Sequence, residues 1–164
     1  SSVSSVFRVP AVALRGLALS FTSGKPWEPV NKGWEETNVE TQAANPESLL
    51  NWYKGLIQLR NAHPALRAGV YLPLTSSCRR VYAVLRQEGD DILLTLASTG
   101  IPSSENCTIA LEGGPLSGTY QAETLWGEPL FDEISFGADG SLKDFFLAPA
   151  LSGGQTLIVR LSQP

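Results

Sequence analysis

Carboxylate side chains are the groups in this sequence that come nearest to a catalytic arrangement. Proton transfer to or from a substrate needs such groups to be held within hydrogen-bond reach of the reacting atoms. Glu88, Asp90 and Asp91 surround a glycine, which is the composition of a tight turn. Asp132 and Glu133 stand in a loop-like stretch with no visible partner. We therefore interpret these acidic residues as turn and loop residues, and we predict no catalytic residue among them.

The single histidine, His63, stands at the end of a helical pattern and directly before a proline. Cationic side chains are favoured in the last turn of a helix, so we expect a helix-end role for it and not that of a ligand or a base. A metal centre needs several histidines, cysteines or carboxylates at close spacing, and a phosphate site needs a glycine-rich loop after a strand. The sequence has neither pattern. It predicts no metal ion and no cofactor.

The two cysteines, Cys78 and Cys107, offer one disulfide bond. A bridge requires their Cα atoms to lie within about 7 Å of each other, which the spacing along the chain does not determine. Buried free thiols are the common alternative. The sequence leaves both states open.

Composition limits the class of protein. A chain of 164 residues with 43% hydrophobic residues can bury one core, and it fits one domain with an appendage. No apolar run is long enough to span a membrane, and the first residues lack the features of a secretory signal peptide. The net charge is -4 and the basic residues are scattered, so nucleic acid is not expected as a partner.

Residues 1 to about 44 lack regular periodicity and predict a long loop. A helix is then predicted from Pro46 to about His63, because Asn45 is a favoured N-cap and proline suits the first helical position. Pro64 ends it. Trp52 and Leu59 flank its broad apolar face. The residues of that face recur at helical spacing: Leu49, Leu50, Tyr53, Leu56 and Ile57.

The pattern becomes β from Val70 onward. Two apolar runs, at 81–85 and 92–96, flank the turn residues 88–91 and predict a hairpin. Further strands are expected at 107–111, 120–126, 145–147 and 156–161. Short strands separated by frequent turn signals predict a mainly β fold, an antiparallel β-sandwich.

Five segments at fixed spacing carry a family resemblance. They read FTSGKPWEPVN at 21–31, TNVETQ at 37–42, NPESLLNWY at 45–53, LIQLR at 56–60 and HPAL at 63–66, with Gly69 after the last. This combination resembles the end of the catalytic barrel in the α-amylase family of glycoside hydrolases, family 13. It is nearest in character to the oligo-1,6-glucosidase and α-glucosidase branch. The rest of the chain matches that family by pattern alone.

The resemblance implies two domains. Residues 1–68 would be the end of a (β/α)8 barrel, a long loop and its last amphipathic helix, and residues 69–164 would be the carboxyl-terminal β-sandwich. The whole enzyme would hydrolyse α-glucosidic bonds with carboxyl groups about 5 Å apart. In the resembled family those groups precede the matched segments. A barrel needs about 250 residues, so we expect this chain alone to be structural and not catalytic.

The resemblance also implies candidate sugar contacts. The arginine that Arg8 matches lies near the substrate in the family, although the methionine and tryptophan that usually follow it are missing here. Exposed indole faces stack on sugar rings, which makes Trp27 and Trp34 further substrate-binding candidates. The alternatives are a salt bridge or solvation for the arginine, and packing for these tryptophans as for Trp52 and Trp126.

Two functions remain open. The chain is either part of a glycosidase or a stand-alone carbohydrate-binding or interaction module. In the first case its partner is the missing catalytic barrel, or a second copy bound through the apolar helix face, since a large exposed apolar patch invites association. In the second case the partner is an α-glucan oligosaccharide. The cellular location stays open between the bacterial cytoplasm and secretion.

Overall fold

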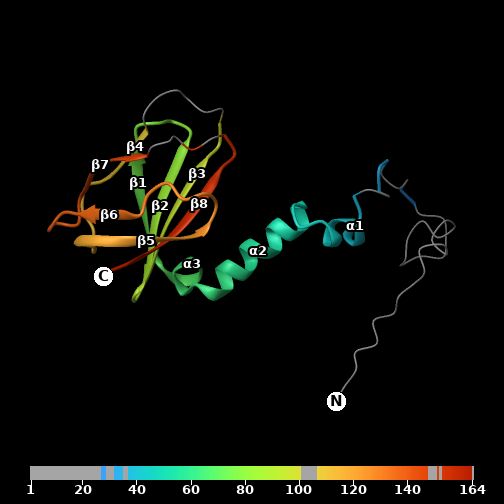
Figure 1. Cartoon of the computed structure of the whole chain (residues 1–164), viewed down its shortest axis with the longest axis horizontal. Helices are drawn as coiled ribbons and strands as arrows, with labels where there is room; N and C mark the ends of the chain where they lie inside the picture. Colours follow the sequence, from blue (N-terminus) through green and yellow to red (C-terminus); the bar gives the residue numbers. More distant parts are fainter. Residues whose placement is uncertain are drawn as a thin grey trace, which may run out of the picture. The chain divides into compact units, whose positions relative to one another are not determined.

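The computed structural model describes residues 27–28, 32–34, 37–100, 107–147, 151 and 153–163 (Figure 1). The chain forms two compact units, which divide between Tyr53 and Lys54 inside one helix. The helices are α1 (Val39–Ala44), α2 (Leu49–Ala62) and α3 (Pro64–Ala68). The strands are β1 (Val70–Ser76), β2 (Val81–Glu88), β3 (Asp91–Ser98), β4 (Cys107–Leu111), β5 (Gly118–Trp126), β6 (Glu133–Phe136), β7 (Leu142–Leu147) and β8 (Thr156–Ser162). The predicted division between residues 68 and 69 differs from the boundary of these units and stays a prediction.

The start of α2 differs from the sequence-based expectation. Asn45 does not cap this helix, because its side chain accepts a hydrogen bond from the backbone N–H of Glu47, at 3.0 Å, and closes a turn. Pro46 lies in that turn. The helix begins at Leu49, and the hydroxyl of Ser48 accepts from the backbone N–H of Asn51 at 3.2 Å. A serine at the next N-cap position has therefore taken the role predicted for the asparagine.

A short helix, α1, lies within the stretch predicted as a loop. Asn38 caps it by accepting from the backbone N–H of Thr41 at 2.9 Å. The side-chain amide of Asn51 then donates to the carbonyls of Gln42 and Asn45, at 3.1 and 2.7 Å, and holds α1 against the first turn of α2. Asn38, Asn45 and Asn51 lie in segments that carry the family resemblance. Their hydrogen bonds fix the bend between α1 and α2.

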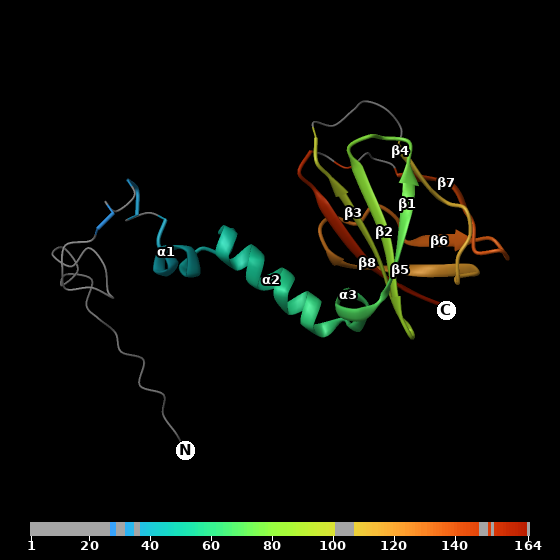
Figure 2. The same ribbon diagram turned by 180° about the vertical axis from the view of Figure 1, so that it is seen from behind.

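The strands form one eight-stranded antiparallel sheet in the order β6-β5-β8-β3-β2-β1-β4-β7. Its edge strands β6 and β7 contact each other, so the sheet is nearly closed around its own interior (Figures 1 and 2). The predicted hairpin is present as β2 and β3, with Glu88 paired to Asp91 across Gly89, whose φ is +57°. The predicted antiparallel β fold is confirmed. β6 was not predicted, because its four residues give too short a pattern.

The inward face of the sheet forms the main core. On the central strands the core residues alternate with outward ones, as the pleat of a strand requires. The fully or almost fully buried residues of this cluster include Leu85, Leu94, Leu96, Ile109, Ile134, Leu147, Leu157, Val159 and Leu161. Each such side chain contributes about 2 kcal/mol by leaving water.

The outward face of the central strands is also buried. Val84 and Leu93 point away from the main core, yet only 4% and 0% of their surfaces are exposed. α3 contacts β2 and β3 on this face (Figure 2). Its own Ala65 is fully buried. α3 is therefore part of the folded β unit.

In the described residues no helix is long and apolar enough to cross a membrane.

Candidate functional site

The junction between α3 and the sheet is where charged and polar side chains converge. Asp91, the first residue of β3, accepts from the Nδ1 atom of His63 at 3.0 Å and from the backbone N–H of Ala65 at 2.9 Å. His63 is the N-cap residue of α3, but its own side chain makes no capping hydrogen bond. The carboxylate of Asp91 therefore supplies from a neighbouring strand the acceptor that the helix N-terminus needs.

Arg86 on β2 satisfies the other end of α3. Its Nε donates to the carbonyl of Ala65 at 2.8 Å, and an Nη atom donates to the carbonyl of Gly69 at 3.1 Å. Arg60, from the last turn of α2, donates to the carbonyl of Leu66. The carbonyl of Ala65 also accepts from the backbone N–H of Gly69 at 3.1 Å, so Arg86 adds a second donor to it. Cationic donors are favoured near a helix C-terminus. We call His63, Asp91 and Arg86, with α3 between them, the junction site.

Sequence reasoning found part of the junction site. His63 does lie at the helix end, between α2 and α3. Asp91 does end the hairpin turn, but its carboxylate is directed to α3, which the interpretation as a turn residue missed. Arg86 was not singled out. Its only sequence signal is that it follows Tyr82 and Val84 at every second residue, on the outward face of β2.

A pair of tyrosines lies on the same outward face. The hydroxyls of Tyr71 on β1 and Tyr82 on β2 lie 3.0 Å apart, and the two side chains are 50% and 46% exposed. The hydrogen bond with Tyr71 raises the pKa of Tyr82, because the neutral phenol keeps its proton in that bond. The sequence analysis did not single out either residue.

None of the residues predicted to contact sugar is a member of the junction site as defined above. Trp27 is 93% exposed and lies in a bend, and Trp34 is partly buried at the end of a turn. Arg8 lies outside the described residues. The substrate-binding role of all three stays a prediction.

The other two tryptophans pack against protein groups. The ring of Trp52 meets that of Tyr53 edge to face, with centroids 5.3 Å apart. Trp126 lies so near α2 that a Cβ atom at Gly55 would come within 2.8 Å of its ring. Packing was the alternative for both tryptophans. Only a glycine allows the helix to approach the indole this closely.

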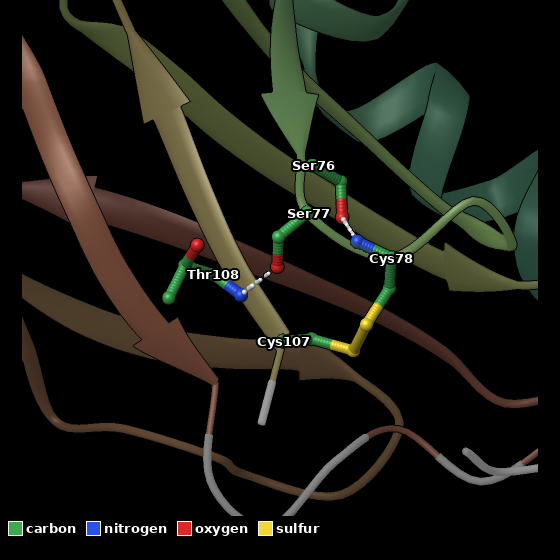
Figure 3. The surroundings of a disulfide bond; sticks show 5 residues. All are labelled: Ser76, Ser77, Cys78, Cys107 and Thr108. Atoms are coloured by element: carbon green, nitrogen blue, oxygen red, sulfur yellow. Dashed lines mark hydrogen bonds between the residues drawn. A yellow bond between two sulfur atoms is a disulfide. The ribbon is translucent and has the colours of Figure 1, made fainter. Parts of the chain in front are cut away.

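The two cysteines form a disulfide bond (Figure 3). Cys78 follows β1 in the turn to β2, and Cys107 is the first residue of β4 and almost fully buried. The flanking serines fix both ends: Ser76 accepts from the backbone N–H of Cys78 at 3.1 Å, and Ser77 accepts from that of Thr108 at 2.9 Å (Figure 3). Of the two states that the sequence left open, the structure has the bridge.

A pocket of about 340 Å³ lies over β4 and β7 and contains several acidic residues, among them Glu112, Asp139 and Asp144. Hydrogen bonds from the hydroxyl and backbone N–H of Ser141 lower the pKa of Asp139, because they stabilise the carboxylate form. Among the described residues no group of three or more histidines, cysteines and carboxylates is placed to hold a metal ion.

Comparison with known proteins shows a partial similarity to one family. Residues 13–69 match the family Alpha-amylase, described as the alpha amylase catalytic domain. The chain is 35% identical over 78 residues to the oligo-1,6-glucosidase of Parageobacillus thermoglucosidasius, over 48% of this chain and 14% of that protein. It is 32% identical over 93 residues to the glucan 1,6-alpha-glucosidase of Streptococcus pneumoniae, over 57% of this chain and 17% of that protein. The chain thus spans less than a fifth of the length of these relatives.

Solved structures of related enzymes are similar to this chain over more of its length. The trehalulose synthase of Pseudomonas mesoacidophila superposes with a TM-score of 0.57 and 28% identity, over 87% of this chain and 23% of that one. The trehalose-6-phosphate hydrolase of Bacillus licheniformis superposes with a TM-score of 0.55 over the same shares. At 22% identity, this second likeness supports the fold alone.

The capping role of Asp91 can be tested against its neighbour in the same turn. Asp91→Ala should lower the free energy of unfolding by about 1–3 kcal/mol, because it leaves a helix N–H and His63 without their acceptor. Asp90→Ala should change it by less than about 0.5 kcal/mol, since Asp90 is exposed in the turn. Urea unfolding measures both. Equal effects of the two substitutions would refute the cap.

The disulfide can be tested by removing it. The bridge links residues 29 positions apart, for which chain entropy gives a stabilisation of about 3–4 kcal/mol. The double substitution Cys78→Ser with Cys107→Ser should therefore lower the urea midpoint. Alkylation of the unreduced, urea-unfolded wild-type chain should label no thiol, and two labelled thiols would show that the bridge is absent.

The family match and the fold meet at one place. The match ends at residue 69, directly after α3, and β1 begins at residue 70. The junction site therefore joins the segment that matches a catalytic domain to the sheet that follows it. Over both parts, this chain resembles the carboxyl-terminal portion of an α-amylase-family enzyme, glycoside hydrolase family 13, of the oligo-1,6-glucosidase type.

Proposed function

We propose that this chain is part of an enzyme that hydrolyses α-glucosidic bonds, and that its own role there is structural. The relatives named above support the reaction class, since they are an oligo-1,6-glucosidase and a glucan 1,6-alpha-glucosidase. The junction site supports the structural role. It is the observation that carries the proposal.

The junction site would act on the catalytic domain by fixing its last helices. α3 has five residues, and an isolated helix shorter than about twelve residues is marginal in water. Asp91 and Arg86 satisfy its two ends from the sheet. Because α2 runs directly into α3, the sheet would hold the end of α2 as well, and with it the wall of a barrel.

The chemistry itself would come from the remainder of the catalytic domain. A retaining glycosidase needs a carboxylate nucleophile and a carboxylic acid about 5 Å apart. Asp91, the carboxylate of the junction site, is already committed to His63 and to a helix N–H. Each oxygen of this carboxylate therefore accepts a hydrogen bond that holds the fold.

A second candidate function, sugar binding, has one observation in its favour. Trp27 is 93% exposed, and an exposed indole face is the usual stacking surface for a sugar ring. In this case the chain would bind maltooligosaccharides or isomaltooligosaccharides by itself. Binding at millimolar ligand that is lost in Trp27→Ala would favour this function over the structural one.

The structural role predicts that the purified chain does not hydrolyse p-nitrophenyl α-glucoside above the uncatalysed rate. It further predicts that the DNA preceding the codon of Ser1 encodes, in frame, an earlier part of a barrel with catalytic carboxylates. Release of nitrophenol, followed by absorbance, checks the first expectation, and sequencing checks the second. Turnover by the chain alone, or an unrelated upstream reading frame, would contradict the proposal.

A further inference from the structure

The pair of strands β4 and β7 joins the rest of the sheet along a short contact. The two strands pair with each other from Cys107 to Leu111 of β4. On its other side, β4 pairs in the described residues with Thr75 and Ser76, the last two residues of β1. By comparison, β1 pairs with β2 over residues 70–74. Few backbone hydrogen bonds therefore hold the β4–β7 pair to β1.

The disulfide lies at the end of this short contact (Figure 3). Beside it, Ser77 donates its backbone N–H to the carbonyl of Thr108 at 3.0 Å, and its hydroxyl accepts from the backbone N–H of Thr108 at 2.9 Å. Ser77 is exposed, so water competes for these hydrogen bonds. Without the disulfide, the β4–β7 pair would be held to β1 by such hydrogen bonds and by the burial of its inward residues.

The two cysteines differ in their access to solvent. Cys107 is only 3% exposed, whereas Cys78 is partly exposed in the turn after β1. Arg79 and Arg80 follow Cys78 directly, and both are exposed. Disulfide exchange needs a thiolate to reach one of the two sulfur atoms, and positive charge nearby favours a thiolate. These features favour attack at Cys78 while the chain is folded.

We propose that this disulfide is a redox-sensitive link that determines how often the β4–β7 pair separates from β1. The reductant is a dithiol, and its thiolate bonds to the sulfur of Cys78. The bond between the two cysteines breaks, and Cys107 leaves with the electron pair and takes up a proton. The second thiolate of the reductant then displaces the sulfur of Cys78, which also takes up a proton. The reductant is oxidised to a cyclic disulfide, and the protein gains two thiols.

Reduction should loosen one edge of the sheet and leave the remainder folded. β2 pairs with β3 from Val81 to Glu88, and no part of that register depends on the bridge. The inward residues Ile109 and Leu147 have 0% and 1% of their surfaces exposed, so their burial still favours the closed position. Since β7 contacts the other edge strand, β6, each separation would open the nearly closed sheet. This inference goes beyond the proposed function and does not depend on it.

The test is amide hydrogen exchange of the full chain without denaturant, before and after treatment with millimolar dithiothreitol. Mass spectrometry of peptides measures the exchange rate of each strand. Reduction should accelerate exchange in β4 and β7 at least about tenfold, because the bridge no longer opposes their separation. Exchange in β2 and β3 should change less than about twofold.

The site of attack is tested with glutathione, a monothiol. A monothiol remains bound to the sulfur that it attacks, so peptide mass spectrometry after an acid quench locates it. The mixed disulfide should be on Cys78. Iodoacetamide should then label the released thiol of Cys107.

Two variants separate the bridge from its surroundings. Cys78→Ser with Cys107→Ser removes the bridge, and it should exchange like the reduced wild-type chain with and without dithiothreitol. Ser77→Ala removes an exposed hydrogen bond at the same contact and keeps the bridge, so it should respond to dithiothreitol as the wild type does. Circular dichroism should show the native spectrum for both variants and for the reduced chain.

Each outcome decides the proposal. Faster exchange confined to β4 and β7, with glutathione on Cys78, supports it. A bridge that dithiothreitol reduces only after urea has unfolded the chain overturns it, as does reduction that leaves exchange unchanged. Faster exchange in all strands overturns it in favour of a bridge that stabilises the whole fold. Glutathione on Cys107 overturns the proposed attack at Cys78.

Discussion

Strand β3 is buried on both of its faces, and this constraint organises the rest of the structure. Leu94 points into the sheet interior and Leu93 points outward, yet neither has any exposed surface. An outward leucine left in water would forfeit about 2 kcal/mol of burial. A two-layer β-sandwich would leave that face to solvent. Here α3 covers it, so the helical segment and the sheet form one folding unit from residue 54 onward.

The same packing explains why polar groups gather at the junction site. A helix of five residues leaves most of its backbone N–H and C=O groups without partners inside the helix. Burying Ala65 against the sheet takes those groups away from water, so each needs a partner in the protein. Asp91 and Arg86 supply partners from the two central strands. Apolar burial positions α3 on the sheet, and Asp91 and Arg86 provide hydrogen-bond partners for its backbone groups.

The proposed function gives these contacts between α3 and the sheet a role in an enzyme whose chemistry lies elsewhere. The sheet follows the segment that matches a catalytic domain, caps α3 and leaves Tyr71 and Tyr82 half-exposed. The disulfide acts at a different place, where it ties the turn between β1 and β2 to the start of β4. β4 pairs with β1 over residues 75 and 76, so the bridge reinforces a short contact between strands.

The sequence by itself determined the local elements. Apolar spacing and Pro64 fixed most of α2 and its end, and Gly89 between two apolar runs fixed the β2–β3 hairpin. The family resemblance was carried by the residues of five segments together with their spacing. Neither the start of α2 at Leu49 nor α1 was predicted, because side-chain hydrogen bonds between α1 and the first turn of α2 decide them.

Only the tertiary structure decided the partners of the junction site. His63 and Asp91 are 28 residues apart, and Ala65 and Arg86 are 21 apart. The disulfide likewise joins a residue of the β1–β2 turn to β4, and the tyrosine pair joins β1 to β2. Periodicity reports which residues share a face of one element, but it does not report which faces meet. Which faces meet depends on strand register and on the path of the chain. Here the decisive contact is the packing of α3 on the outward face of β3, which is buried on both faces.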